Sequence, residues 1–256
     1  MDPSAIGLLP LVLIVTTIAV GAFIKGITGL GLPIFAIPTL AMFVPIDHAV
    51  VIMVLPSVIA NSWLILVHRE HLPVLKEHRT FIILGVAGAF TGTWILASAN
   101  DTILRSLLAF WLGIYLLQHF LNKDTPRTIS AGNLTAGPLG FAAGTLQGAT
   151  GISAPIIAPY YHARNLTTSM YAFAVASSFM LLSVSQLVGL TTANLITPTL
   201  AGYGVLATIT TMVFIPVGVR YSHKLSQRTF GRILITVFVL IEVKLIYDVL
   251  SLIGWL

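Results

Sequence analysis

The sequence predicts an all-α polytopic membrane protein, and three observations lead to this fold class. Hydrophobic residues make up 57% of the 256 residues and charged residues only 8%, whereas soluble domains carry about 25% charged residues to cover their surface. The mean hydropathy is +0.97. The segment 165–219 runs for 55 residues without Asp, Glu, Lys or Arg. About 20 apolar residues span a bilayer once, so this segment alone predicts two membrane crossings.

Composition also excludes several classes of function. The chain has no cysteine, which rules out disulfides, iron–sulfur clusters and thiolate chemistry, and we expect no cofactor and no metal. The net charge of +5 is explained by basic cytoplasmic loops, so we expect no nucleic-acid partner. No Gly-x-x-x-x-Gly-Lys-Ser/Thr loop is present, so ATP does not drive transport directly. Coupling would come from H+, from Na+ or from the gradient of the cargo itself.

Ten apolar segments predict 8–10 membrane segments in two sets. The first set lies at 5–24, 31–45, 49–67, 80–98 and 103–121, and the second at 131–147, 152–162, 168–190, 199–218 and 230–250. Most have the length of a span. The segments 31–45 and 152–162 are too short to cross comfortably, and each follows a Gly-rich stretch. We therefore expect the chain to break twice within the membrane, where it lines a cavity or is covered by protein.

The two Gly-rich stretches match each other. The sequence from Lys25 to Ala36 aligns without gaps to the sequence from Gln147 to Ala158, with six of the twelve positions identical at a spacing of 122. A spacing near half the chain length indicates an internal duplication, which is common in secondary transporters. We expect a first repeat at 1–122, a cytoplasmic linker at 123–130 and a second repeat at 131–256, each with a Gly-rich broken helix or re-entrant hairpin followed by three transmembrane helices.

The distribution of Lys and Arg predicts that the repeats are inverted. The segments 68–79 and 219–232 are rich in Lys and Arg, and the linker 123–130 holds two more, while the turns near Asp47, near Asp101 and at 191–198 hold none. Basic loops favour the cytoplasm. Corresponding loops of the two repeats then lie on opposite sides, and both termini are expected to be non-cytoplasmic.

The two breaks predict a binding site for an anion near the middle of the membrane. Glycine lets the backbone turn and approach a ligand closely. The helices that restart after each break point their N-terminal N–H groups at the break, and helix N-termini favour anions. Hydroxyl and amide groups lie beside them. The expected substrate-binding residues are Lys25, Gly26, Thr28, Gly29, Gly31, Gln147, Gly148, Thr150, Gly151 and Ser153.

Lys25 is the only charged residue between Pro3 and Ile46, and two interpretations of it stay open. An ionisable residue inside a span indicates a functional site, so Lys25 can contact the anion. Its long side chain can equally extend from a full-length first span to the membrane interface. Five polar residues of the following spans form candidate pathway positions or helix–helix hydrogen bonds. They are Ser57, Asn61, Ser177, Ser178 and Gln186.

Other polar residues receive structural interpretations. His68, Glu70, His71, Glu77 and His78 lie in one basic loop, which we expect to be solvated rather than to bind a metal. Glu242 in the last apolar segment is expected to be a structural or interfacial group, with a proton relay as the alternative.

The sequence Gly26-Ile-Thr-Gly-Leu-Gly-Leu-Pro33, repeated as Gly148-Ala-Thr-Gly-Ile-Ser-Ala-Pro155, resembles the TauE/SafE family, also called the toluene-sulfonate uptake permease family. The resemblance covers the whole chain. It implies a transporter, often an exporter, of sulfur-containing anions such as sulfite or organosulfonates, integral to the plasma (bacterial inner) membrane. Members tend to carry more glycines in the first motif, and Ser153 stands where a glycine is common.

Residues and resemblance together predict a secondary transporter that exports small sulfur-containing anions. Its partners are the anion, the lipid bilayer and a coupling H+ or Na+, and nothing in the sequence indicates an oligomeric state. The alternative is an anion channel or a structural membrane protein of the same fold. An enzyme is not expected, because the spans lack a nucleophile–base pair or paired carboxylates.

Overall fold

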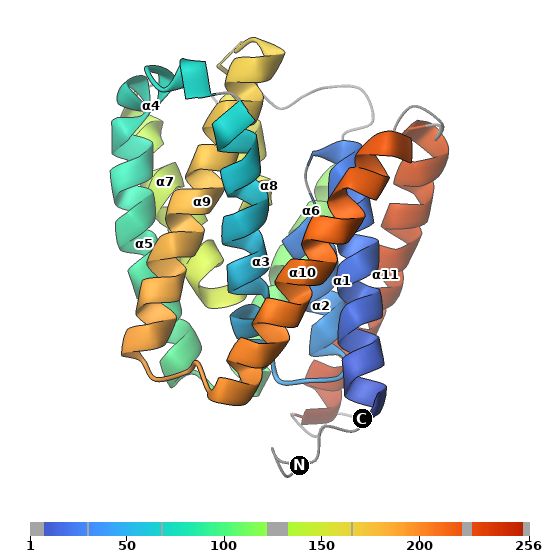
Figure 1. Ribbon diagram of the computed structural model, residues 1–256. Coiled ribbons are helices and arrows are strands. Elements are labelled where there is room, and N and C mark those ends of the chain that lie inside the picture. Colours follow the sequence, from blue (N-terminus) through green and yellow to red (C-terminus); the bar gives the residue numbers. More distant parts are fainter. Residues whose placement is uncertain are drawn as a thin grey trace.

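The computed structural model describes residues 8–29, 31–67, 69–121, 133–164, 166–221 and 227–252, and these residues are helical apart from the turns between helices (Figure 1). The first half contains α1 (Leu8–Thr28), α2 (Leu32–Ala41), α3 (Ile46–Val67), the short helices η1 (Arg69–His71) and α4 (Val74–Glu77), α5 (Arg79–Ser98) and α6 (Asp101–Leu121). The second half contains α7 (Asn133–Thr150), α8 (Ala154–His162), α9 (Thr168–Thr192), α10 (Pro198–Tyr221) and α11 (Gln227–Leu252).

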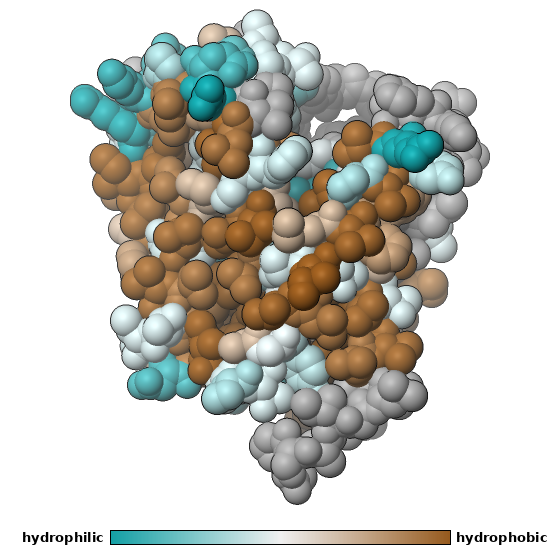
Figure 2. All heavy atoms as spheres, viewed as in Figure 1, coloured by the Kyte–Doolittle hydropathy of each residue, from teal (hydrophilic) through white to brown (hydrophobic). Residues whose placement is uncertain are grey.

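Each of the ten expected apolar segments coincides with a helix, and the expected linker 123–130 lies outside the described residues. Four helices of the described chain, α3, α5, α9 and α10, are long and apolar enough to cross a membrane. Shorter apolar helices occupy 11–27 and 32–41. Apolar side chains cover most of the face shown in Figure 2, and polar ones gather toward its two ends. This arrangement is that of an integral membrane protein.

The expected breaks occur at 29–31 and 151–153, and backbone geometry explains them. Gly29 has φ 76° and Gly151 has φ 70°, in the left-handed region that favours glycine. The amide N–H of each donates to the carbonyl four residues earlier, at 2.8 Å, and thereby closes the last turn of α1 and of α7. Pro33 and Pro155 follow in the first turns of α2 and α8, where the fixed φ of proline suits a helix start.

Small residues let α5 and α7 pack at very close range. Glycines recur every four residues on α7, at Gly140, Gly144 and Gly148, and face the backbone of α5. A Cβ on Gly144 would collide with the carbonyl oxygen of Gly85, which itself lies opposite on α5. Membrane helices use this pattern because close backbone approach gains van der Waals contact that lipid cannot replace. The α5–α7 pair thereby forms a rigid support beside the second break.

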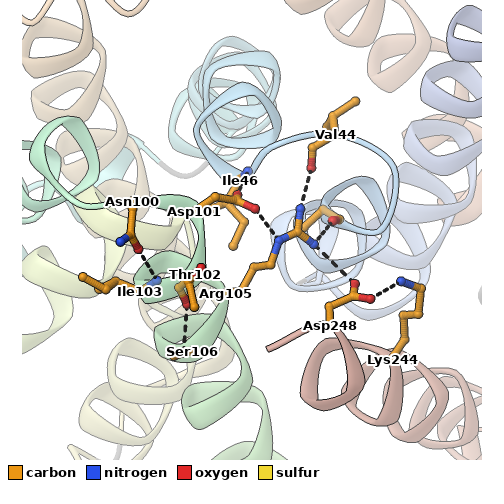
Figure 3. A network of polar contacts seen from close by, with 11 residues as sticks. Val44, Ile46, Asn100, Asp101, Thr102, Ile103, Arg105, Ser106, Lys244 and Asp248 are labelled. Atoms are coloured by element: carbon orange, nitrogen blue, oxygen red, sulfur yellow. Dashed lines mark hydrogen bonds and ion pairs between the residues drawn. The ribbon is translucent and has the colours of Figure 1, made fainter. Parts of the chain in front are cut away.

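A network of charged side chains fixes the far end of α2 (Figure 3). The Arg105 guanidinium on α6 donates to the carbonyl oxygen of Ala41 at 2.6 Å and pairs with Asp101 at 2.5 Å and Asp248 at 3.4 Å. Asp248 on α11 also pairs with Lys244 at 2.5 Å. The other carboxylate oxygen of Asp101 accepts from the Ile46 N–H at 3.1 Å, at the start of α3. The network thus satisfies backbone groups that the ends of α2 and α3 leave unpaired and ties this short helix to α6 and α11.

Replacing Gly144 by valine should destabilise the protein, because the side chain has no room against the Gly85 carbonyl. Overpacking of this kind costs about 1–3 kcal/mol, so the thermal unfolding temperature in detergent should fall. Gly202 on α10 is the matched control, because a Cβ there would meet nothing within 4 Å. Gly202→Val should leave the unfolding temperature nearly unchanged. Equal unfolding temperatures for the two variants would contradict the close α5–α7 packing.

Candidate functional site

A small cavity lies where the two breaks meet. Its lining comes from α1, α2 and α3 of the first half and from α7, α8 and α9 of the second half. The volume is about 20 Å³, which holds about one water molecule. The lining residues are Lys25, Gly31, Pro33, Ile34, Ser57, Asn61, Gln147, Gly151, Ile152, Ser153, Ala154, Phe179 and Ser183. Residues from both Gly-rich motifs therefore face one another across a single space.

Lys25 contributes the positive charge of the cavity. Its residue is only 7% exposed, so the side chain does not extend to water at the membrane interface. Its Nζ donates to Oδ1 of Asn61 on α3 at 2.9 Å. The Asn61 amide is held in turn, because its Nδ2 donates to the Ser57 carbonyl at 2.8 Å. The acceptor that Lys25 contacts is thus a neutral amide, and no acidic residue stands among the described residues that line the cavity.

Gln147 faces the cavity from the second half and carries no charge. Its Oε1 accepts from the Ser153 hydroxyl at 2.7 Å, and its Nε2 donates to Oε1 of Gln186 at 3.1 Å and to the Ser183 hydroxyl at 3.3 Å. Gln186 in turn donates to the carbonyl of Gln147 at 2.6 Å and to that of Gly148 at 3.2 Å. The Gln147 side chain is therefore positioned by hydrogen bonds on both of its polar atoms.

Two helices begin at the cavity. Gly31 is the N-cap of α2 and Ser153 is the N-cap of α8, and neither helix start has a side-chain cap. The first N–H groups of a helix lack partners within the helix and carry partial positive charge. Both N-cap residues line the cavity, so it combines one ammonium group with two uncapped helix starts. This donor set suits an anion with several oxygen atoms.

Several expected binding residues are constrained by helix packing or bond within their own helix. Gly26 and Gly148 pack against backbone, since a Cβ on Gly26 would collide with the Ile215 carbonyl of α10 and one on Gly148 with the Ala89 carbonyl of α5. Close helix packing thus requires glycine at both positions, and substrate contact by these two residues stays a prediction. The Thr150 hydroxyl donates to the Leu146 carbonyl at 2.8 Å and is not among the groups that line the cavity. The side chain of Thr28 lies outside the described part of the chain.

The glycines of the two breaks are constrained in different ways. A Cβ on Gly29 would meet nothing within 4 Å, so its positive φ alone favours glycine. At Gly151 a Cβ would collide with the Ile37 side chain as well. Gly31 has φ 110°, whereas Ser153 has φ −124°, a conformation that any residue adopts. Serine can therefore stand where the motif of the family that the chain resembles commonly has glycine.

The expected pathway residues divide into two groups. Ser57 and Asn61 line the cavity, and Gln186 reaches it through Gln147. Ser178 instead bonds to the Tyr161 hydroxyl at 2.8 Å. The Ser177 hydroxyl is buried without a partner in the described chain and lies outside the lining.

Phe179 and Ser183 line the cavity and were missed by sequence reasoning. A signal for Ser183 existed: it follows Gln147 by 36 residues, as Asn61 follows Lys25.

A vestibule of about 230 Å³ leads away from the cavity between α3 and α9. It shares Asn61 and Phe179 with the cavity and continues past Tyr171 to Thr168 at the start of α9. A wider apolar groove of about 460 Å³ lies between α3 and α10 and reaches Lys25 from the side, past the exposed residues Trp63 and Met212.

Two further polar residues, His78 and Glu242, are buried or partly buried outside the cavity. His78 is buried rather than solvated, packs edge-on against Tyr160 and Tyr161, and contacts Arg164 at 3.2 Å. Burial and the Arg164 charge lower the pKa of His78, so the imidazole is neutral at neutral pH. Glu242 on α11 approaches Gly113 of α6, and one of its carboxyl oxygens is buried without a partner in the described chain. Neither group reaches the cavity.

Comparison with known proteins identifies the family of the chain. No curated protein and no solved structure gives a significant match to the chain. A family model described as "Sulfite exporter TauE/SafE" matches residues 13–245, which is nearly the whole chain. The chain belongs to the TauE/SafE sulfite exporter family.

Proposed function

We propose that the protein is a secondary transporter that exports small sulfur-containing anions, such as sulfite or organosulfonates, and that it binds them in the cavity between the two breaks. The observation that carries this proposal is the buried ammonium group of Lys25, whose acceptor Asn61 is neutral. A buried charge without a counter-charge is costly. An anion from outside removes that cost, and the family to which the chain belongs supplies the chemical class of the anion.

We further propose that residues 1–122 and 131–256 are inverted repeats. Helices of the two halves end at Thr28 and Thr150, and their successors begin at Leu32 and Ala154, in each case 122 residues apart. The contact between Lys25 and Asn61 has its counterpart between Gln147 and Ser183 at the same spacing. The first helix of each half also packs on a helix of the other half: α1 packs on α10, and α7 packs on α5. These correspondences favour two re-entrant hairpins, α1–α2 and α7–α8, that meet head to head.

The orientation of the hairpins supports opposite entry into the membrane. In Figure 1, α1 begins at the end of the bundle opposite α4, and α7 begins near the α4 end. The α4 end carries Lys76 and Arg79, the basic residues that favour the cytoplasm. We therefore propose that the first hairpin enters from outside and the second from the cytoplasm of the bacterial inner membrane, and that both termini are non-cytoplasmic.

The dimensions of the cavity favour a carrier over an open channel. A volume of about 20 Å³ is too small for a sulfonate group, so the lining has to move before an anion is bound. The vestibule past Tyr171 opens toward the start of α9, on the side of α4 (Figure 1). We propose that it is the cytoplasmic access route and that Phe179 and Asn61 separate it from the bound anion. A membrane potential negative inside drives a monoanion outward by about 2.3 kcal/mol per 100 mV.

Transport rather than catalysis fits the residues around the cavity. The described lining holds no His, Asp or Glu that would serve as a general base for its serines. We propose that the cargo leaves chemically unchanged.

Lys25→Gln should weaken anion binding and slow exchange. A hydrogen bond to a charged group contributes about 1.5–3 kcal/mol, so the dissociation constant for sulfite should rise roughly 10- to 150-fold. Binding is measured by calorimetry in detergent. Exchange is measured by counterflow, in which unlabelled sulfite inside liposomes should accelerate uptake of labelled sulfite by the wild type.

Lys76→Gln is the matched control, because Lys76 is an exposed lysine on α4 outside the cavity. It should bind and exchange as the wild type does. Unchanged affinity in Lys25→Gln would remove Lys25 from the site. Uptake by the wild type that ignores the internal anion would indicate an open pore.

Single cysteines should report the orientation, because the chain has none of its own. The two substitutions are Lys76→Cys on α4 and Ala193→Cys in the turn between α9 and α10. Both positions are exposed, and α4 and this turn lie at opposite ends of the bundle (Figure 1). A membrane-impermeant maleimide added to intact cells should label position 193 and should label position 76 only after the membrane is opened. The reverse pattern would contradict the proposed orientation.

A further inference from the structure

We propose that the site binds singly charged anions and discriminates against doubly charged ones, so that sulfite is carried as bisulfite and sulfate is rejected. This inference rests on the proposed function and specifies the substrate of the same cavity. It follows from counting the fixed charges, the helix dipoles and the free donors around the cavity.

The fixed side-chain charge of the cavity is a single positive charge. Among the described residues of the lining, Lys25 is the only one that ionises; the others are Gly, Ala, Pro, Ile, Phe, Ser, Asn and Gln. Among the residues that the structure describes, no ionisable side chain of α2, α3, α7, α8 or α9 lines the cavity opposite Lys25. The vestibule adds Tyr171, whose phenol stays neutral in the neutral pH range.

Helix dipoles do not add a second positive charge. The starts of α2 and α8 carry partial positive charge, about half an elementary charge for each helix. At each break, however, another helix ends: α1 ends at Thr28 beside the start of α2, and α7 ends at Thr150 beside the start of α8. The negative end of one helix therefore lies within a few residues of the positive end of the next. The dipoles orient an anion locally and leave the net charge near that of Lys25 alone.

Two of the three serine hydroxyls in the described lining, those of Ser57 and Ser153, already donate to protein acceptors, and Ser183 adds one neutral hydroxyl. The Ser57 hydroxyl donates to the Met53 carbonyl at 2.8 Å, and the Ser153 hydroxyl donates to Gln147 at 2.7 Å. The Lys25 ammonium has three N–H donors and gives one to Asn61, which leaves two. A monoanion neutralises the buried ammonium group. A dianion would leave one negative charge uncompensated in the same buried space, which carries a large desolvation penalty.

The first experiment compares three anions on the purified wild-type protein. Methanesulfonate is a monoanion at every pH used, sulfate is a dianion, and sulfite converts from monoanion to dianion near neutral pH. We expect methanesulfonate to bind at least tenfold more tightly than sulfate. The dissociation constant for total sulfite should rise as the pH increases from mildly acidic to mildly alkaline, approaching tenfold per pH unit. Methanesulfonate at the same pH values reports any titration of the protein itself, so the sulfite effect is read as a ratio to it.

The second experiment adds a second cation at the matching position of the other repeat. Gln147→Lys places an ammonium group across the cavity from Lys25, and Gln147→Met is the uncharged control of similar size. The preference for methanesulfonate over sulfate should fall at least tenfold in Gln147→Lys relative to Gln147→Met. Should Gln147→Lys fail to fold, the wild-type comparison decides the inference alone.

The outcomes separate this inference from the proposed function. Sulfate that binds as tightly as methanesulfonate, or a sulfite affinity that rises with pH relative to methanesulfonate, would overturn the monoanion rule and leave the transporter intact. An absence of binding for all three anions at every pH would overturn the proposed function itself, and the monoanion rule with it.

Discussion

The structure depends on one constraint: a single ammonium group is buried at a place where the membrane helices are broken. Lys25 is 7% exposed, and the group it contacts is the neutral Asn61 amide. Burying an unpaired charge is unfavourable, so the surrounding chain has to supply polar groups at membrane depth. Asn61 supplies the acceptor for Lys25, and its own amide is held by a hydrogen bond to the Ser57 carbonyl. The two uncapped helix starts and the Gln147 amide lie around the same cavity and do not compensate the ammonium charge. Under the proposed function, an anion supplies the counter-charge that the surrounding residues lack once the lining has opened to admit it.

The rest of the bundle keeps these broken helices in place. Positive-φ glycines make each break, and prolines restart the helices. The close contacts of α7 with α5, and the Arg105 network at the far end of α2, leave the short helices little freedom to shift. The cavity itself holds only about one water. Movement that admits an anion is thus expected at the side-chain boundary between cavity and vestibule, near Phe179 and Asn61, rather than within the rigid helix pairs.

Much of this fold could be predicted from sequence, because apolar segment length and Gly-Pro breaks act locally. The ten apolar segments each became a helix, and both breaks occurred where the motif repeats. The packing environment of individual site residues was harder to predict. Gly26 and Gly148 belong to the motif expected to contact a ligand, but the need for glycine there also comes from close packing on α10 and α5, which are distant in sequence. The Thr150 hydroxyl donates to a carbonyl of its own helix. Phe179 lines the cavity, but the residue 122 positions before it is the polar Ser57, so the matching motif does not predict an aromatic residue there. Long-range packing of this kind leaves no local pattern.

The central claim is that the anion lies between the two breaks, against Lys25. The most direct measurement is a diffraction structure of the protein with selenite, in which selenium replaces the sulfur of sulfite and gives an anomalous signal. The account predicts one selenium peak in the cavity, with selenite oxygens within hydrogen-bond distance of Lys25 Nζ and close to the Gln147 side chain. A selenium peak elsewhere, with none in the cavity lined by Gly31 and Gly151, would show that the anion does not bind against Lys25.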